Sequence, residues 1–133
     1  MRDPTLIADA DVLLLESTYA NRDHRPLAAT LDELAASLEH ALSGKQGVVL
    51  VPAFAVGRTQ EFLYYLSSMS RAGRLRNLHV FVDSPMATEV TRITAQHFDL
   101  FDAEARRFAR EPVPDGRAPV LTFIETVEES KAL

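Results

Sequence analysis

Polar residues that can move protons or hold charge follow the apolar segments of this sequence, at Glu16, Asp83 and Ser84. Glu16 ends the run Asp-Val-Leu-Leu-Leu-Glu, and partial burial there would raise its pKa toward the range useful for proton transfer. A carboxylate that caps a nearby helix is an equally good interpretation of Glu16. For Asp83 a favourable charge at the start of a helix is the simpler interpretation, although several acids at one sheet edge could also hold magnesium.

Basic residues offer a second kind of chemistry, the binding of anions. Gly57-Arg58, at a predicted helix start, could present backbone N–H groups and a guanidinium to a phosphate. His24 is predicted in a loop beside Arg22. Of the twelve arginines, eight fall within residues 58–110. Solvated helix faces are the simpler explanation of that cluster, and a phosphate-binding patch is the alternative.

Motifs for several other chemistries are missing. The chain has no cysteine, and none of its four histidines has a second histidine two to four residues away, as in HxH or HExxH, so the sequence predicts no zinc site. The patterns GxGxxG, GxxxxGK[ST] and GxSxG are also absent. The sequence therefore gives no support to a dinucleotide fold, a P-loop or a serine hydrolase.

The spacing of apolar residues predicts an α/β fold that would position these groups. Buried strands are predicted at 11–16, 48–51, 78–82 and 120–124, and helices at 27–42, 57–73, 84–97 and 102–110. Thr30 with Glu33 and Thr126 with Glu129 predict capping boxes, and Ser84 followed by Pro85 predicts a helix cap. Strands that alternate with helices are typical of a parallel, Rossmann-like three-layer sheet with helices on both faces. Ligands of such sheets bind at the carboxyl ends of the strands, here 16–24, 52–58, 83–85 and 125–126.

Length and composition favour one ordinary globular domain. The chain has 133 residues, 47% of them hydrophobic, and a net charge of -5. That charge argues against binding nucleic acid by bulk electrostatics, although it permits a local basic cleft. No apolar stretch approaches the ~20 residues of a membrane span, so we expect a cytoplasmic protein that does not bind a membrane. A capping box so close to Leu133 favours a chain that continues beyond this residue.

Four segments, taken together, resemble the β-CASP branch of the metallo-β-lactamase superfamily, a group of RNA-processing nucleases. These segments are Glu16–Tyr19, Val51–Arg58 with Gln60-Glu61, Asp83–Ala87 and Glu128–Leu133. Glu-Ser-Thr-Tyr is closer to the cleavage-and-polyadenylation nucleases than to the ribonuclease J branch. The family loop usually reads Tyr-Gly-Asp-Arg, whereas Tyr19 is followed here by Ala-Asn-Arg.

The resemblance implies a division of the chain and of the chemistry. Residues 1–22 would come from the lactamase side of a domain junction, and 23–133 would be the β-CASP domain, truncated at its C-terminus. Glu16 would be the family's acidic catalytic residue. Two zinc ions would be bound by the lactamase-fold domain of the same protein and none by this chain.

The function implied is therefore that of a substrate-clamping part of a zinc-dependent ribonuclease, catalytically incomplete without the lactamase domain. Arg22, His24, Arg58 and Ser84 would contact single-stranded RNA. The sequence does not decide whether the RNA is cut from an end or internally. It also leaves open whether the protein is a monomer or a homodimer. Two alternatives remain: a free-standing doubly wound phosphate or nucleotide binder that uses loops 52–58 and 83–85, and a structural interaction domain.

Overall fold

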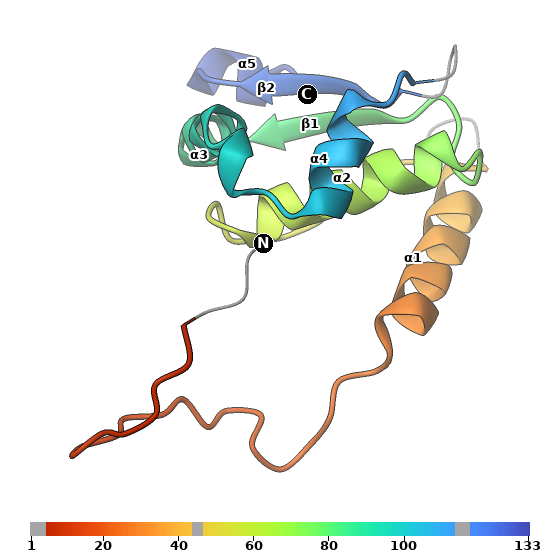
Figure 1. The fold of residues 1–133 in the computed structure, drawn as a ribbon. Helices are drawn as coiled ribbons and strands as arrows, with labels where there is room; N and C mark the ends of the chain where they lie inside the picture. The colour runs from red at the N-terminus through yellow and green to blue at the C-terminus, as the bar shows by residue number, and fades with distance from the viewer. Residues whose placement is uncertain (1–4, 44–46, 114–117) are drawn as a thin grey trace.

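The computed structural model describes residues 5–43, 47–113 and 118–133 (Figure 1). Its elements, in chain order, are α1 (Leu27–Leu42), α2 (Arg58–Arg71), β1 (His79–Asp83), α3 (Pro85–Gln96), the 3₁₀ helix η1 (Phe98–Leu100), α4 (Ala103–Arg110), β2 (Val120–Ile124) and α5 (Val127–Lys131). The α/β class predicted from the sequence is confirmed. No helix in these ranges is long and apolar enough to cross a membrane.

Strands β1 and β2 form a parallel pair. Their register runs from His79 opposite Val120 to Asp83 opposite Ile124. Parallel neighbours cannot be joined by a tight turn, and the connection between them here carries α3, η1 and α4. Both strands end at the same edge, where α3 and α5 begin (Figure 1).

The sheet is smaller than predicted, because the segments 11–16 and 48–51 are not strands. Both are irregular in backbone conformation, and Leu14 and Leu50 are 93% and 88% exposed. A strand that is apolar on both faces needs neighbours on its edges and layers on its faces. Within the described ranges neither segment has a ladder partner, so the predictions of these two strands were wrong.

The helices follow the sequence pattern closely, with one difference at a helix start. Helix α1 begins after Pro26, so Thr30 and Glu33 lie inside the helix and do not form the predicted capping box. The Thr30 hydroxyl instead donates to the Pro26 carbonyl at 3.2 Å. The other two predicted starts are confirmed, because Ser84 caps α3 and Thr126 with Glu129 forms a capping box on α5.

The largest buried cluster joins α1, α2 and the segment before β1. Its members are apolar residues with 8% exposure or less, namely Ala35, Leu38, Leu66, Met69, Leu75 and Leu78. Full burial of one such leucine or methionine contributes about 1.5–3 kcal/mol. This cluster fixes α2, whose first residues form part of the site described below.

Residues 5–26 form an arm that runs away from the sheet before the chain enters α1 (Figure 1). All the side chains of this arm are exposed. Its contacts include the local hydrogen bond from the Ala20 N–H to the Ser17 carbonyl at 3.1 Å and an ion pair between Arg25 and Glu33 of α1. The arm therefore carries Glu16, Arg22 and His24 apart from the residues of α2 and α3.

Candidate functional site

The carboxyl edge of the β1–β2 pair is held together by side chains from three elements. Asp83 is the last residue of β1, and its Oδ2 atom accepts a hydrogen bond from the Ser130 hydroxyl of α5 at 2.7 Å. The Arg92 guanidinium of α3 reaches Glu125, just after β2, at 3.4 Å. These contacts tie α3 and α5 to the strand ends. Asp83 is thus a structural partner of α5, in line with the simpler interpretation of this residue.

Ser84 starts α3 at this edge. Its Oγ atom accepts a hydrogen bond from the Ala87 N–H at 3.2 Å, and its carbonyl accepts one from the Thr88 N–H at 2.9 Å. Since the Ser84 hydroxyl acts here as an acceptor, its own hydrogen can still be donated to a ligand. The side chain is half-buried, which holds it in place beside the strand end.

The start of α2 lies beside α3. Gln60 Nε2 donates to the Thr91 hydroxyl of α3 at 2.9 Å and to the Ala55 carbonyl at 3.1 Å. Gly57 precedes the helix with a φ of 79°, a left-handed conformation that favours glycine. The loop and first turn of α2 therefore lie against the middle of α3.

The backbone at the start of α2 is not the phosphate cradle that the sequence suggested. The N–H groups of Gly57, Arg58 and Thr59 donate to Gln60 Oε1 at 2.8 Å, the Val56 carbonyl at 3.0 Å and the Phe54 carbonyl at 3.3 Å. The Arg58 side chain, at the first residue of α2, is 69% exposed. It pairs with Glu61 at 2.8 Å. An exposed pair of this kind is weak, so a phosphate can compete with Glu61 for the guanidinium.

Glu16 lies in the arm and not at the end of a buried strand. Hydrogen bonds from the Thr18 hydroxyl and from the Thr18 N–H, the latter 2.5 Å from Glu16 Oε1, lower the pKa of the Glu16 carboxyl. The sequence-based expectation of a raised pKa was wrong, because the burial that it required is absent. The carboxylate is ionised at neutral pH, and its catalytic role stays a prediction.

Arg22 and His24 meet on one aromatic ring of the arm. The His24 ring lies 4.6 Å from the Tyr19 ring, and the Arg22 guanidinium lies 4.7 Å from the centre of the same ring. The structure thus groups these two predicted residues with Tyr19. Figure 1 shows the arm that carries them running away from α2 and α3, the helices that begin at Arg58 and just after Ser84.

One exposed aromatic residue escaped the sequence reasoning. Phe54 lies in the loop before α2, four residues from Arg58, and is 85% exposed. The sequence does hold a signal for this residue, since the ring lies between Pro52 and Gly57 in a predicted loop. Loops run over the surface, so an aromatic ring in such a loop is expected to be exposed.

The described residues do not form a metal centre. In the ranges 5–43, 47–113 and 118–133, no three side chains of His, Asp or Glu come together as ligands. A zinc site needs three or four converging donors. The donor set described here does not fit zinc, and we assign no step of a reaction to a metal in this chain.

Comparison with known proteins decides the family. The Beta-Casp domain model matches residues 59–133, which include Ser84, α3, both strands and α5. This chain belongs to the β-CASP family. The resemblance inferred from the four sequence segments is confirmed.

Relatives of this β-CASP chain carry the names of ribonucleases and of an RNA-processing subunit. It is 38% identical to "Ribonuclease TTHA0252" of Thermus thermophilus, over 98% of the chain and 30% of the relative. It is 30% identical to "Endoribonuclease YSH1" of Eremothecium gossypii, over 81% of the chain and 14% of the relative. It is also 28% identical to "Cleavage and polyadenylation specificity factor subunit 3" of Dictyostelium discoideum, over 72% of the chain and 12% of the relative. The chain thus spans less than a third of the length of each of these relatives.

Proposed function

We propose that this β-CASP chain is the RNA-clamping part of a ribonuclease and forms one wall of a cleft for single-stranded RNA. Membership of the β-CASP family and the ribonuclease names of its relatives support this assignment. The proposed division is residues 1–22 on the lactamase side of a junction and 23–133 as the β-CASP domain.

The observation that carries the proposal is a set of three side chains around α2 and α3, of which Arg58 and Phe54 are exposed and Ser84 is half-buried. Arg58 offers a charged donor, Ser84 a hydroxyl and Phe54 an aromatic face. Proteins that bind single-stranded nucleic acid combine such cations with aromatic rings on which bases stack. The Tyr19, Arg22 and His24 group on the arm repeats the combination of cation and ring.

The proposal assigns the metal chemistry to another part of the protein. Two zinc ions bound by the lactamase-fold domain would supply an activated hydroxide for attack on the RNA phosphate. This chain would bind and orient the RNA, in the cytoplasm, and Glu16 would act at the junction of the two domains. Cleavage within the RNA and cleavage from an end both fit this division, as do a monomer and a homodimer.

The exposed apolar run of the arm fits the same division. Val12 to Leu15 are 73–93% exposed in the isolated chain. A contiguous exposed apolar stretch is typical of a surface that another unit covers. We propose that the lactamase-fold domain of the same protein covers this apolar stretch.

A binding titration tests the clamping role. The 133-residue chain should bind a fluorescently labelled single-stranded RNA with saturable anisotropy that weakens as salt is added. Arg58→Gln should weaken binding and make the slope of log Kd against log salt shallower by about 0.7. Arg74→Gln is the matched control, because it also removes one arginine from an ion pair, with Asp32, on another surface. Equal effects of the two substitutions would contradict a role for Arg58.

Competition separates this function from a nucleotide-binding domain. A mononucleotide at the same concentration of phosphate should displace the RNA poorly, because it offers one contact where the clamp uses several. If the mononucleotide and the RNA bind equally well, the free-standing nucleotide binder is the better account. Cleavage of RNA by this chain alone with added zinc would contradict the assignment of the metal chemistry to another domain.

A further inference from the structure

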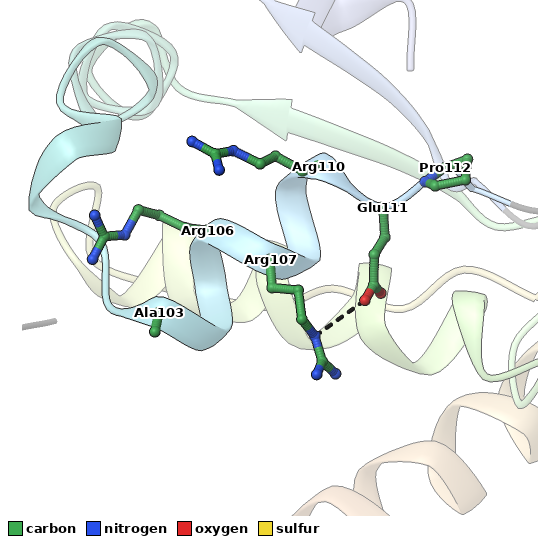
Figure 2. A pocket seen from close by; sticks show the side chains of 6 residues that line it. All are labelled: Ala103, Arg106, Arg107, Arg110, Glu111 and Pro112. Atoms are coloured by element: carbon green, nitrogen blue, oxygen red, sulfur yellow. Dashed lines mark ion pairs between the residues drawn. The ribbon is translucent and has the colours of Figure 1, made fainter.

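An arginine-lined hollow lies along α4, apart from the loop before α2 and the Ser84 cap. This open hollow of about 490 Å³ is bordered by Ala103, Arg106, Arg107, Arg110, Glu111 and Pro112 (Figure 2). Its lining has three arginines and a single acid. In a chain with a net charge of -5, such a local excess of positive charge is distinctive.

Two of the three guanidinium groups are available to a ligand. Arg106 and Arg110 are one helical turn apart and extend to the same side of α4, whereas Arg107 turns away and pairs with Glu111 at 3.1 Å (Figure 2). Among the described residues, no carboxylate pairs with Arg106 or Arg110. In the part of the chain that the structure describes, Arg106 Nε makes a long contact of 3.4 Å with the Asp102 carbonyl.

The helix that carries these arginines is fixed on the body of the chain. The Asp102 carboxylate caps it by accepting from the Ala105 N–H at 2.8 Å. Phe108, which does not line the hollow, packs against the Tyr64 ring at 4.9 Å and lies under the Arg71 guanidinium at 4.2 Å. Arg71 also donates to the Glu111 carbonyl at 2.8 Å, which holds the end of α4. The two free arginines therefore have a rigid base.

We propose that Arg106 and Arg110 bind successive phosphates of a single-stranded RNA and extend the contact with RNA beyond the clamp. Residues one helical turn apart have Cβ atoms about 5–6 Å apart, which suits two neighbouring phosphates on one strand. The guanidinium fork matches phosphate oxygens in a bidentate manner. This inference rests on the proposed function, because it gives the bound RNA a second point of contact.

The composition of the hollow favours nucleic acid over an acidic protein. Protein interfaces have cores depleted of charged residues and enriched in apolar ones. Here the lining offers only Ala103 and Pro112 as apolar residues. The Arg110 guanidinium also lies 5.6 Å from the centre of the Phe98 ring, so a cation and an aromatic side chain are paired beside the hollow.

The test compares two double variants of the 133-residue chain. The first variant, Arg106→Gln with Arg110→Gln, removes the two guanidiniums proposed to bind phosphate. The second variant is a matched control, Arg74→Gln with Arg76→Gln, which removes two arginines from the loop after α2. Glutamine has nearly the helix propensity of arginine, so α4 should persist. Thermal melting of each variant checks the fold, and Arg106→Lys with Arg110→Lys keeps the charge.

In anisotropy titrations with a single-stranded RNA long enough to span both sites, the α4 variant should bind about tenfold more weakly. The slope of log Kd against log salt should be shallower by about 1.4 for this variant, since each phosphate contact on a single strand contributes about 0.7 to the slope. The lysine variant should recover the slope. The control variant should change the affinity by less than about twofold.

The outcomes separate this inference from the function on which it rests. If the wild-type chain binds no RNA, the proposed function and this inference both fail. If it binds RNA and the α4 variant binds equally well, or no worse than the control variant, only this inference fails. If a polyglutamate peptide displaces the RNA from the wild type but not from the α4 variant, the hollow is a protein-docking site and the RNA assignment is wrong.

Discussion

At the scale of single residues, the aromatic and charged side chains of the α2 region that are proposed to meet RNA are exposed. Phe54 is 85% exposed, and the Arg58 side chain is 69% exposed. Exposed aromatic rings contribute little to the stability of the fold and are available for stacking. Binding and stability can therefore be separated by substitution at these positions.

Phe54→Ala should weaken binding of single-stranded RNA about tenfold, because stacking of one base on an aromatic ring contributes about 1–3 kcal/mol. The melting temperature should stay the same, since the ring is not part of the core. Phe54→Trp, which keeps an aromatic face, should retain the affinity. Anisotropy and thermal melting measure the two effects, and a parallel loss of both would make Phe54 a structural residue.

Glu16→Gln should lower turnover by at least about tenfold in the protein that carries this chain together with its lactamase-fold domain. RNA affinity should change little. Because the pKa of Glu16 is lowered, the wild-type carboxyl is ionised at neutral pH, so we expect it to act as a charge or a base and not as an acid. Glu39→Gln, on α1, is the control. Unchanged turnover in Glu16→Gln would leave the residue as a cap for the turn at Thr18.

Sequence reasoning at this scale found roles that depend on neighbours in the chain. Ser84 followed by Pro85 predicted a helix cap, and the structure has that cap. Sequence reasoning failed to predict the direction of the pKa shift of Glu16, because the burial of a side chain depends on packing against distant residues. It also missed Phe54, since an exposed and a buried phenylalanine look alike in a sequence.

At the scale of elements, α2 connects the core to the site. Leu66 is 3% exposed on the face toward α1, and the same helix begins at Arg58. Apolar spacing predicted both helices because a buried helix face repeats every three or four residues. It did not predict that 11–16 and 48–51 lack a ladder partner, since an apolar run indicates burial without identifying what covers it.

Leu66→Ala should lower the free energy of unfolding by about 2–5 kcal/mol, because a buried leucine leaves a cavity when truncated. Urea unfolding followed by circular dichroism measures the loss. Leu6→Ala, at a site that is 93% exposed, should change the stability by no more than about 0.5 kcal/mol. Equal effects of these substitutions would contradict the assigned core.

Helix α5 should depend on pH through Glu129. Hydrogen bonds from the N–H groups of Glu125 and Thr126 lower the pKa of the Glu129 carboxyl below its ordinary value of 4.5. A carboxyl whose pKa is lowered on folding stabilises the folded state above the unfolded pKa, and that contribution is lost as pH falls through the folded pKa.

Glu129→Ala should therefore lower the melting temperature at pH ~7 and lower it by less at pH ~3. Glu128→Ala is the control, because among the described residues Glu128 accepts no hydrogen bond of this capping box. Melting followed by circular dichroism at the two pH values gives the comparison. A loss that does not depend on pH would contradict the role of the ionised carboxylate.

At the scale of the whole molecule, the chain combines a parallel α/β body with an exposed apolar arm. The alternation of strands and helices was sufficient to predict the class, because parallel strands need crossovers. The size of the sheet was not predictable, since pairing of a strand depends on partners that the pattern does not name. The β-CASP family match and the exposed side chains of Phe54 and Arg58 are the two observations on which the proposed RNA-clamping role rests.

The central claim is that single-stranded RNA contacts the loop before α2, the start of α3 and, on the separate arm, the Tyr19 group. Ultraviolet cross-linking of the chain to a photoreactive single-stranded RNA, followed by mass spectrometry of the peptides, locates the contact directly. We predict cross-links at Phe54 and Tyr19 that excess unlabelled RNA removes and an equal amount of mononucleotide does not. Saturable cross-links confined to α1, with none at either aromatic residue, would contradict the account.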